Sequence, residues 1–595
     1  MNVAEYIVSY IEKKHVHTVF MVTGGQAMFL NDAVYKSKKI RPIFHHHEQA
    51  AAMAAEGYGR ISGGMGVAMI TAGPAGVNAL TGVVGAYVDS SPMIVIAGQS
   101  SSGNAQYMEN THIRQYGLQG INMKPLASSV TKYYVSIDDP LTVTYHLEKA
   151  WYIATHGRPG PVWIDVPLDM QRMTMPERGM KQFDDSEYAT SSSISPSDMD
   201  RIVTLIENAK RPLCIAGHGI YCAFAMRELG VFLKKTRMPV ATTRLGIDLI
   251  DSSIKQFVGR PGLYGDRPAN FAVQSADLII AIGARLDPGI AGYDASEWGR
   301  RAFKVIVDID QKELDKPGIE PSLRVLADAN VFLTALNTRL VQTKRSSYSS
   351  WVHRISDWKK RYPMCLPEYT KEKKVNSYLL TDRLSEQANA KDTIVVDTSS
   401  PFHVVCQAWK IKKGQRFITT GGISTMGYWP SAIGASVARP GGQTIVVTGD
   451  GCLQMNLQEL ATLKQNALNI KVFVINNNGY LLIRHTQQLH MGGRLMGESP
   501  KTGLYLPDPM KIAKAYGIKS VRISSPKELD RTISSILSYI GPMIIDVISP
   551  EWQQIIPRVS SQKAADGRMI SKAYDDLFPF LPREEYEAMT QLYDL

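Results

Sequence analysis

The chain has 595 residues, of which 44% are hydrophobic and 20% charged, and its formal net charge at pH 7 is +11. This length is too great for one hydrophobic core and predicts three or four domains, with the composition of a globular rather than a disordered protein. Lys and Arg are scattered, which argues against nucleic acid as a partner, and five cysteines without CxxC spacing favour reduced thiols in a cytoplasmic protein.

Residues 1–178 are expected to form the first domain, because helical and strand patterns alternate along them. Glu5, Glu12 and Lys13 interrupt the apolar run at the start, so it predicts an amphipathic helix near 3–14 rather than a signal peptide or a membrane span. The other expected elements are strands at 18–23, 66–71 and 92–97 and helices at 48–61 and 76–87. This alternation is typical of a doubly wound α/β domain.

Two more α/β domains and a tail are expected after a polar, Ser-rich linker at residues 181–198. The second domain, 195–342, contains apolar strands at 212–216, 277–282 and 304–309. The third domain is expected at 372–553. Residues 554–595 form a C-terminal tail with an amphipathic helical end, which either docks on the protein or covers its active site. The predicted fold class is α/β, with three doubly wound parallel-sheet domains.

Polar residues follow two apolar strands of the third domain. The strand at 444–448 precedes Gly449-Asp450-Gly451, a helical segment follows, and the strand at 470–475 precedes Asn477. Adjacent parallel strands would place Asp450 and Asn477 side by side at one edge of the sheet. Such oxygen ligands, without His or Cys, suit Mg²⁺, and the amides of Gly451 and Cys452 can donate to a diphosphate. The segment therefore predicts a metal-bound diphosphate.

This segment resembles the cofactor motif of thiamine diphosphate enzymes, in which GDG is followed at a similar distance by NN. In that family a backbone carbonyl at the place of Gly479 also binds the metal. The resemblance implies that Asp450, Asn477 and Gly479 hold Mg²⁺, and that Gly449 to Cys452 contact the diphosphate.

Glu48 follows three histidines in HHHEQAAAMAAEGYGR and starts a helix. Such a glutamate is usually an N-terminal helix charge, and three consecutive histidines cannot all face one metal, so zinc is not expected. The segment is, however, similar to one in acetolactate synthase and its relatives, whose glutamate hydrogen-bonds a ring nitrogen of the cofactor's aminopyrimidine. The resemblance implies that Glu48 is catalytic, because a carboxylate there promotes removal of the proton from the cofactor's reacting carbon.

Other segments extend the resemblance. Thr425-Met426-Gly427 resembles the family's TMG segment, which implies that Met426 holds the cofactor in its bent form, although an apolar Met is otherwise typical of a core. TAGPAGVN resembles the family's TSGPGATN, which implies that Pro74 and Asn78 line the pyrimidine pocket, although a turn would use the same residues. Gln119 falls on a catalytic-pocket glutamine of acetolactate synthase.

Several positions depart from acetolactate synthase. Leu118 and Gly120 replace the phenylalanine and glutamate that flank the glutamine. The diphosphate-side loop, formed by Thr398, Ser399 and Ser400, lacks the Gly-Gln-His pattern but is still expected to bind cofactor. Thr486 stands in place of a tryptophan. The second substrate, which would accept the product of decarboxylation, therefore cannot be inferred from acetolactate synthase.

The middle domain resembles the family's flavin-binding domain. The residues that carry this likeness are Gly217-His218-Gly219, residues 261–265, Arg285-Leu286-Asp287, Asp308-Ile309 and Asp328-Ala329. Pro288 and Gly289 replace a further Asp and Arg of the family. FAD, another adenine nucleotide such as ADP, or no ligand at all therefore remain possible.

The resemblance covers about residues 1–550 and implies decarboxylation of a 2-oxo acid such as pyruvate, followed by carboligation to a second carbonyl. A non-ligating decarboxylase, a carboligase with a specialised acceptor such as a sugar, and an inactive regulatory or structural homologue are the alternatives. In this family the glutamate and the metal ligands of one site belong to different subunits, which implies a homodimer or homotetramer.

Overall fold

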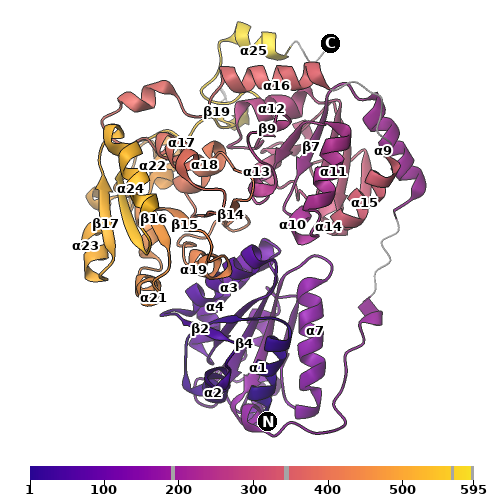
Figure 1. The fold of residues 1–595 in the computed structure, drawn as a ribbon, viewed down its shortest axis with the longest axis vertical. Helices are drawn as coiled ribbons and strands as arrows, with labels where there is room; N and C mark the ends of the chain where they lie inside the picture. The colour runs from indigo at the N-terminus through magenta and orange to yellow at the C-terminus, as the bar shows by residue number, and fades with distance from the viewer. Residues whose placement is uncertain (189–193, 341–347, 564–568, 591–595) are drawn as a thin grey trace.

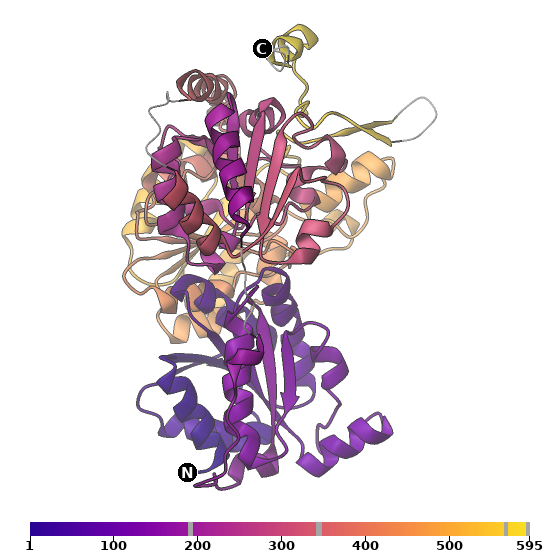
Figure 2. The same cartoon turned by 90° about the vertical axis from the view of Figure 1, so that its right-hand side faces the viewer.

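The structure is a computed structural model, and it describes residues 1–188, 194–340, 348–563 and 569–590. Within them the chain forms three six-stranded parallel sheets flanked by helices, which confirms the predicted fold class. Figures 1 and 2 show the first domain at one end of the molecule, with the other two side by side at the opposite end. Residues 189–193 of the predicted linker, and 564–568 and 591–595 of the tail, lie outside the described residues.

The first sheet has the strand order β2-β1-β3-β4-β6-β5, and the elements expected from the sequence lie within two residues of their expected bounds. Strands β3, β4 and β6 are buried along their whole length, which explains their nearly continuous apolar sequences. The elements are β1 Thr18–Met21, β2 Arg41–Phe44, β3 Gly66–Ile70, β4 Met93–Gln99, β5 Tyr133–Ser136, β6 Pro161–Pro167, α1 Val3–Lys13, α2 Met28–Lys36, α3 Glu48–Ser62, α4 Pro74–Val88, α5 Ser102–Thr111, α6 Lys124–Ala127, α7 Val143–Thr155 and α8 Leu168–Arg172.

The second sheet has the order β12-β11-β10-β7-β8-β9, so the chain reverses its direction across the sheet between β10 and β7. Open α/β sheets bind ligands at such a switch point. The elements are β7 Pro212–Ala216, β8 Val240–Thr242, β9 Phe257–Gly259, β10 Leu278–Ile282, β11 Phe303–Asp308, β12 Leu323–Leu326, α9 Pro196–Asn208, α10 Gly219–Cys222, α11 Met226–Thr236, α12 Arg267–Ser275, α13 Pro288–Ala291, α14 Gln311–Asp315, α15 Ala329–Arg339 and α16 Ser349–Arg361.

The third sheet has the order β14-β13-β15-β16-β18-β17, with its switch point between β13 and β15. The elements are β13 Thr393–Val396, β14 Arg416–Thr419, β15 Thr444–Gly449, β16 Ile470–Asn476, β17 Lys519–Ile523, β18 Met543–Ile548, α17 Ser377–Gln387, α18 Ser400–Ala408, α19 Ser431–Ala438, α20 Asp450–Gln454, α21 Glu459–Gln465, α22 Leu481–His490, α23 Pro509–Ala515 and α24 Leu529–Ser538. The loops that follow β13 and β15 therefore meet at one place.

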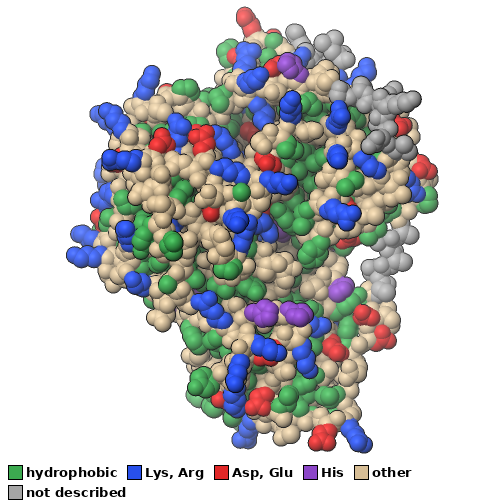
Figure 3. Space-filling view, in the orientation of Figure 1, with side chains coloured by type: hydrophobic (Ala, Val, Ile, Leu, Met, Phe, Trp, Pro, Cys, Tyr) green, Lys and Arg blue, Asp and Glu red, His purple; other side chains and the backbone are tan. Residues whose placement is uncertain are grey.

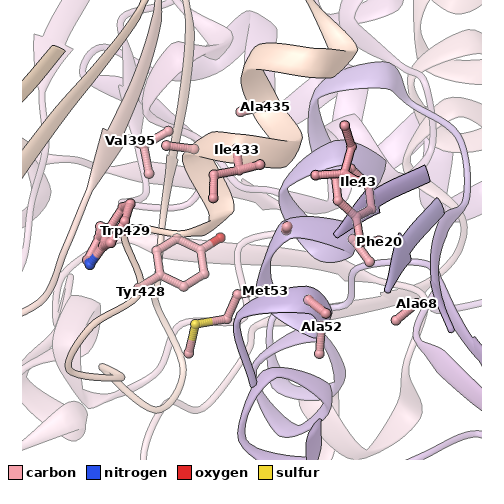
Figure 4. Packing of buried hydrophobic residues seen from close by; sticks show 14 of the residues in the cluster. Phe20, Ile43, Ala52, Met53, Ala68, Val395, Tyr428, Trp429, Ile433 and Ala435 are labelled. Atoms are coloured by element: carbon pink, nitrogen blue, oxygen red, sulfur yellow. The ribbon is translucent and has the colours of Figure 1, made fainter. Parts of the chain in front are cut away.

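The first and third domains share one hydrophobic core, in which helix α3 packs on helix α19. Figure 4 shows Phe20 and Ile43 on one side of this core and Tyr428, Trp429 and Ile433 on the other. The helices lie so close that a Cβ atom at position 434 would overlap the carbonyl oxygen of Ala54, which explains the glycine there. The start of α3 is thus fixed relative to the third domain.

Two clusters of buried polar side chains span this contact between the first and third domains. Arg60 donates to Glu56 at 3.0 Å and to the carbonyl of Thr419 at 2.9 Å, and the Tyr428 hydroxyl also donates to Glu56. The Nδ1 atom of His45 lies 2.8 Å from Glu459, and both side chains have no exposed surface.

Replacing Glu459 with Ala is expected to lower the free energy of unfolding by about 3–5 kcal/mol, because it breaks a buried pair. Burial raises the pKa of Glu459, but hydrogen bonds from His45, Thr462 and the N–H of His46 outweigh it and hold that pKa below its ordinary value of 4.5. The stabilisation is therefore complete above about pH 5 and is lost as the pH falls through the lowered pKa.

Differential scanning calorimetry of wild type and variant at neutral and acidic pH checks this expectation. Replacing the exposed Glu368 with Ala is the control. A variant with the melting temperature of the wild type at neutral pH would show that the pair does not stabilise the contact.

The described part of the tail docks on the middle domain and ends in helix α25, Arg583–Thr590. The Tyr574 hydroxyl donates to the carbonyl of Ile290, and Arg267 donates to the carbonyl of Pro579 at 2.7 Å. On the face shown in Figure 3, Lys and Arg side chains are spread over the whole surface with Asp and Glu among them. Among the described helices, none combines the length and apolar character needed to cross a membrane.

Candidate active site

Asp450 and Asn477 lie at the same edge of the third sheet. Strands β15 and β16 are neighbours, with Gly449 opposite Ile475, so the residues that follow them come together. One oxygen of Asp450 accepts the N–H of Gly451 at 2.8 Å, and the other accepts the N–H of Gly479 at 3.0 Å. The three proposed metal ligands therefore form one cluster.

The charge and hydrogen bonding of this cluster fit a cation. Burial raises the pKa of Asp450 to about 7, against the opposing effect of backbone N–H groups. The side-chain oxygen of Asn477 is buried and has no hydrogen-bond partner in the described part of the chain. A buried carboxylate and an unpartnered amide oxygen are both costly without a ligand, and oxygen donors of this kind suit Mg²⁺.

Arg484 of α22 holds the loop that supplies two of these ligands, and the sequence interpretation missed it. Its guanidinium pairs with Glu498 at 2.6 Å and donates to the carbonyls of Asn477 at 3.4 Å and Asn478 at 3.1 Å. Gly479 has φ +146°, a backbone conformation that favours glycine. The shape of the loop thus depends on a buried cation that lies outside the segment Asn476-Asn477-Asn478-Gly479.

Asp397 holds the diphosphate-side loop, and it was also missed. Its Oδ1 atom accepts the N–H groups of Thr398 at 2.8 Å, Gly427 at 3.1 Å and Tyr428 at 3.1 Å, while its Oδ2 accepts the Thr448 hydroxyl at 3.0 Å. Burial raises the pKa of Asp397 to about 6. One carboxylate thus joins the loop after β13, the TMG segment and strand β15. Its place at the end of an apolar strand was the signal that could have revealed it.

The loop at 398–400 leads into helix α18. Ser399 precedes the helix with φ +69° and ψ −142°, a strained conformation for a residue with a side chain, and such strain is common at functional sites. The buried Ser400 begins the helix, and the thiol of Cys452 lies 3.9 Å from the carbonyl oxygen of Thr398. The N–H groups at this helix start and in the GDG turn are suited to a diphosphate.

Met426 and Thr425 lie beside the GDG turn. A Cβ atom at position 451 would lie 3.3 Å from the terminal methyl of Met426 and would overlap the ring of Tyr480. Met426 is half-buried, and the N–H of Thr425 donates to the hydroxyl of Thr420 at 3.1 Å. An apolar side chain thus stands over the turn.

The predicted residues of the first domain form a second group around the start of helix α4. The amide of Asn78 donates to Glu48 at 3.0 Å. Pro74 is the first residue of α4, and the exposed Gln119 has its carbonyl against Gly73, which precedes the helix. Gly73 lies at the switch point of the first sheet, so this group also occupies a ligand-binding edge.

Within one chain the two groups are separate. Glu48 and Ala52 lie one turn apart on the side of α3 that faces α4, where Ala52 packs against Gly82. Met53 instead extends from α3 toward Tyr428 of the third domain, as Figure 4 shows, and its sulfur accepts from Asn456. Among the described contacts of Glu48, none reaches the Asp450 cluster.

A cavity of about 400 Å³ lies at the switch point of the middle sheet, where all three domains meet. It is lined by some of the middle-domain residues that the resemblance singles out, including His218, Arg285, Asp308 and Asp328, and by residues of both other domains, including Asp89, Phe402 and Gly422. Residues 261–265, which the resemblance also singles out, are not among the described residues that line it. The volume of the cavity and its position at a switch point are typical of a small-molecule or cofactor site.

Known sequences agree with this geometry. Sequence models described as thiamine pyrophosphate enzyme N-terminal TPP binding domain, central domain and C-terminal TPP binding domain match residues 1–126, 199–336 and 397–547. The acetolactate synthase large subunit of Cyanidium caldarium is 30% identical over 578 residues, which cover 94% of this chain and 95% of that protein. The chain belongs to the thiamine pyrophosphate enzymes.

Two further relatives of this thiamine pyrophosphate (diphosphate) enzyme are also acetolactate synthases. The acetolactate synthase large subunit of Lactococcus lactis is 30% identical and covers 96% of each chain. The mitochondrial acetolactate synthase catalytic subunit of Saccharomyces cerevisiae is 30% identical over 93% of this chain and 82% of that protein. The family predicted from the sequence is therefore confirmed. The N-terminal match contains the group around Glu48, and the C-terminal match contains the Asp450 cluster.

Proposed function

We propose that this thiamine pyrophosphate enzyme requires Mg²⁺, decarboxylates a 2-oxo acid such as pyruvate, and joins the product to a second carbonyl. The names of its relatives support the reaction type. This chain supports the proposal mainly through two buried groups at the edge of the third sheet: the carboxylate of Asp450, and the side-chain oxygen of Asn477, which has no partner among the described residues. When bound there, the cofactor supplies a nucleophilic carbon and accepts the electron pair released with CO₂.

In this proposal the residues of the third domain bind the metal and the cofactor and orient the cofactor. Asp450, Asn477 and the Gly479 carbonyl hold Mg²⁺, while Arg484 keeps their loop in shape. The N–H groups at the starts of α18 and α20 bind the diphosphate. Met426 supports the bend of the cofactor through apolar contact.

Glu48 controls a proton in the proposed site. Its carboxylate bonds a ring nitrogen of the aminopyrimidine, and Asn78 fixes the direction of the carboxylate. Gln119, whose carbonyl lies against Gly73 in the same group, would contact substrate.

We further propose that the active site forms between two subunits of a homodimer or homotetramer. Support comes from the direction of Glu48, which lies on the α4 side of α3 rather than on the side that contacts its own third domain. Each third domain would then face the Glu48 group of a neighbouring chain.

Combining two inactive chains is expected to restore activity. Glu48→Gln and Asp450→Asn chains, co-expressed with different tags and purified as a mixed dimer, would form one intact site of two and show about half the wild-type specific activity. A mixed-tag dimer of two Glu48→Gln chains is the control and should stay inactive. A mixed dimer without activity would instead place the whole site within one chain.

We propose FAD, or another adenine nucleotide, as the ligand of the central cavity. The carboxylates of Asp308 and Asp328 at the ends of strands β11 and β12 support this, because such groups can accept from ribose hydroxyls. Flavins absorb at about 450 nm, so a band there in the spectrum of the purified protein would identify FAD. Its absence, with ADP bound on calorimetry, would favour the plain nucleotide.

The reaction itself is tested by incubating the purified protein with pyruvate, thiamine diphosphate and Mg²⁺ and identifying the product by mass spectrometry. Acetolactate is the expected product. Acetaldehyde alone would show a decarboxylase without ligation, and no consumption of pyruvate or of other 2-oxo acids would contradict the proposed function.

A further inference from the structure

Nearly every charged side chain that lines the central cavity has a partner. Arg158 pairs with Asp310 at 3.0 Å and with Glu313 at 2.9 Å, and Arg285 pairs with Asp287 at 2.8 Å. The remaining acids accept backbone N–H groups: Asp89 from Gly421 and Gly422, Asp308 from Asp310, and Asp328 from Asn330 and Val331. These charges are satisfied within the chain.

Arg244 is different. It follows strand β8 and lines the cavity, yet in the described residues its guanidinium makes no ion pair and no hydrogen bond. Its Nη2 atom is buried, and its guanidinium carbon lies 5.0 Å from the centre of the Phe402 ring. An aromatic face favours a cation but does not replace hydrogen-bond acceptors, so this arrangement is costly without a ligand.

The position of Arg244 links the cavity to the active site. Phe402 lies in the first turn of α18, directly after the loop at 398–400 that we assign to the diphosphate. On the other side, a Cβ atom at position 289 would lie 3.7 Å from the Nη1 atom of Arg244. That is an ordinary van der Waals distance, so the guanidinium lies directly beside Gly289.

We propose that Arg244 binds an oxyanion, a carboxylate or a phosphate, on the ligand that occupies this end of the cavity. The guanidinium offers a planar fork of N–H donors that matches either group. Two ligands could carry the oxyanion: the 2-oxo acid, in which case the inference rests on the proposed function, or a nucleotide held across the middle sheet. Arg244 is then a specificity residue that selects an acidic ligand over a neutral one.

The test uses protein loaded with thiamine diphosphate and Mg²⁺ and the variants Arg244→Met and Arg244→Lys. Steady-state kinetics give KM and kcat for pyruvate, and calorimetry gives the Kd for ADP. Removing the charge is expected to raise one of these constants, KM or Kd, by about 10- to 100-fold, the usual effect of a lost hydrogen bond to a charged group. Lysine keeps the charge but not the planar fork, so it should retain only part of the binding, and kcat should change less than KM.

The two arms distinguish the sources of the oxyanion. A raised KM for pyruvate with unchanged ADP binding identifies the carboxylate, and the reverse identifies the phosphate. Arg227→Met, at a guanidinium outside the cavity with 89% of its side chain exposed, is the matched control. If wild-type protein does not turn over pyruvate, the proposed function fails, but direct binding of pyruvate and ADP still tests Arg244.

Two results would overturn the proposal. One is an Arg244→Met protein with the wild-type melting temperature and both constants within about twofold of wild type, since a lost charged contact costs more. The other is wild-type protein that binds neither pyruvate nor ADP, which would leave the cavity without an oxyanion ligand.

Discussion

Replacing Glu48 with Gln is expected to lower kcat by about 10²- to 10⁴-fold, the range that general acid–base groups contribute. Glutamine keeps the size of the side chain and can still accept from Asn78, but its amide cannot exchange a proton with the nitrogen of the pyrimidine ring as a carboxyl group can. Steady-state kinetics with pyruvate measure the loss. Calorimetry should show that thiamine diphosphate still binds, because the diphosphate and metal contacts lie in the third domain.

The control for this variant is Glu368→Gln, which removes an exposed carboxylate and should leave both measurements unchanged. Unchanged turnover in the Glu48→Gln protein would exclude the role assigned to Glu48. Loss of both turnover and cofactor binding would mean that the carboxylate mainly holds the cofactor.

Replacing Asp450 with Asn is expected to weaken Mg²⁺-dependent binding of thiamine diphosphate by about 100-fold or more, because a buried charged contact to the metal is lost. Calorimetric titration of the cofactor at fixed Mg²⁺ measures this. Without metal the variant should melt within a few degrees of the wild type, because relief of a buried unpaired charge offsets the one backbone N–H that the amide nitrogen can no longer accept.

Measuring both the affinity for thiamine diphosphate and the melting temperature without metal separates an effect on binding from an effect on folding. Asp530→Asn, at a carboxylate that is 65% exposed in the same domain, should bind cofactor as the wild type does. An Asp450→Asn protein that binds thiamine diphosphate with wild-type affinity would contradict the metal assignment. One that melts at a lower temperature without metal would show instead that Asp450 is needed for the fold.

The sheets of this protein could be predicted because their inner strands are buried on both faces. Strands β3, β7 and β15, for example, are continuous apolar runs whose bounds the sequence marks with Gly, Pro or charged residues. Helix α5 was not expected, because its sequence is mostly polar and Met108 is its one residue buried in the described structure. A surface helix of this kind leaves no apolar stripe to detect.

The site could be predicted only where its residues form local motifs. Asp450 and Asn477 stand at recognisable strand ends, and the family resemblance pointed to Glu48 and Met426. Arg484 and Asp397 lie outside these motifs and act through backbone groups. Asp397 accepts N–H groups some thirty positions away, and Arg484 donates to carbonyls six and seven positions before it.

Which charged side chains find a partner could not be predicted from the sequence either. That Arg244 has no partner in the part of the chain that the structure describes depends on where every neighbouring acid finds its own partner, which only the folded chain reveals.

The most direct test of an active site shared by two subunits is a crystal structure of the protein with thiamine diphosphate and Mg²⁺. We expect the metal between Asp450, Asn477 and the diphosphate, and the carboxylate of Glu48 of the partner subunit at hydrogen-bond distance from the pyrimidine ring. A cofactor bound elsewhere, or one at the Asp450 cluster with no Glu48 from any chain beside its ring, would contradict the account.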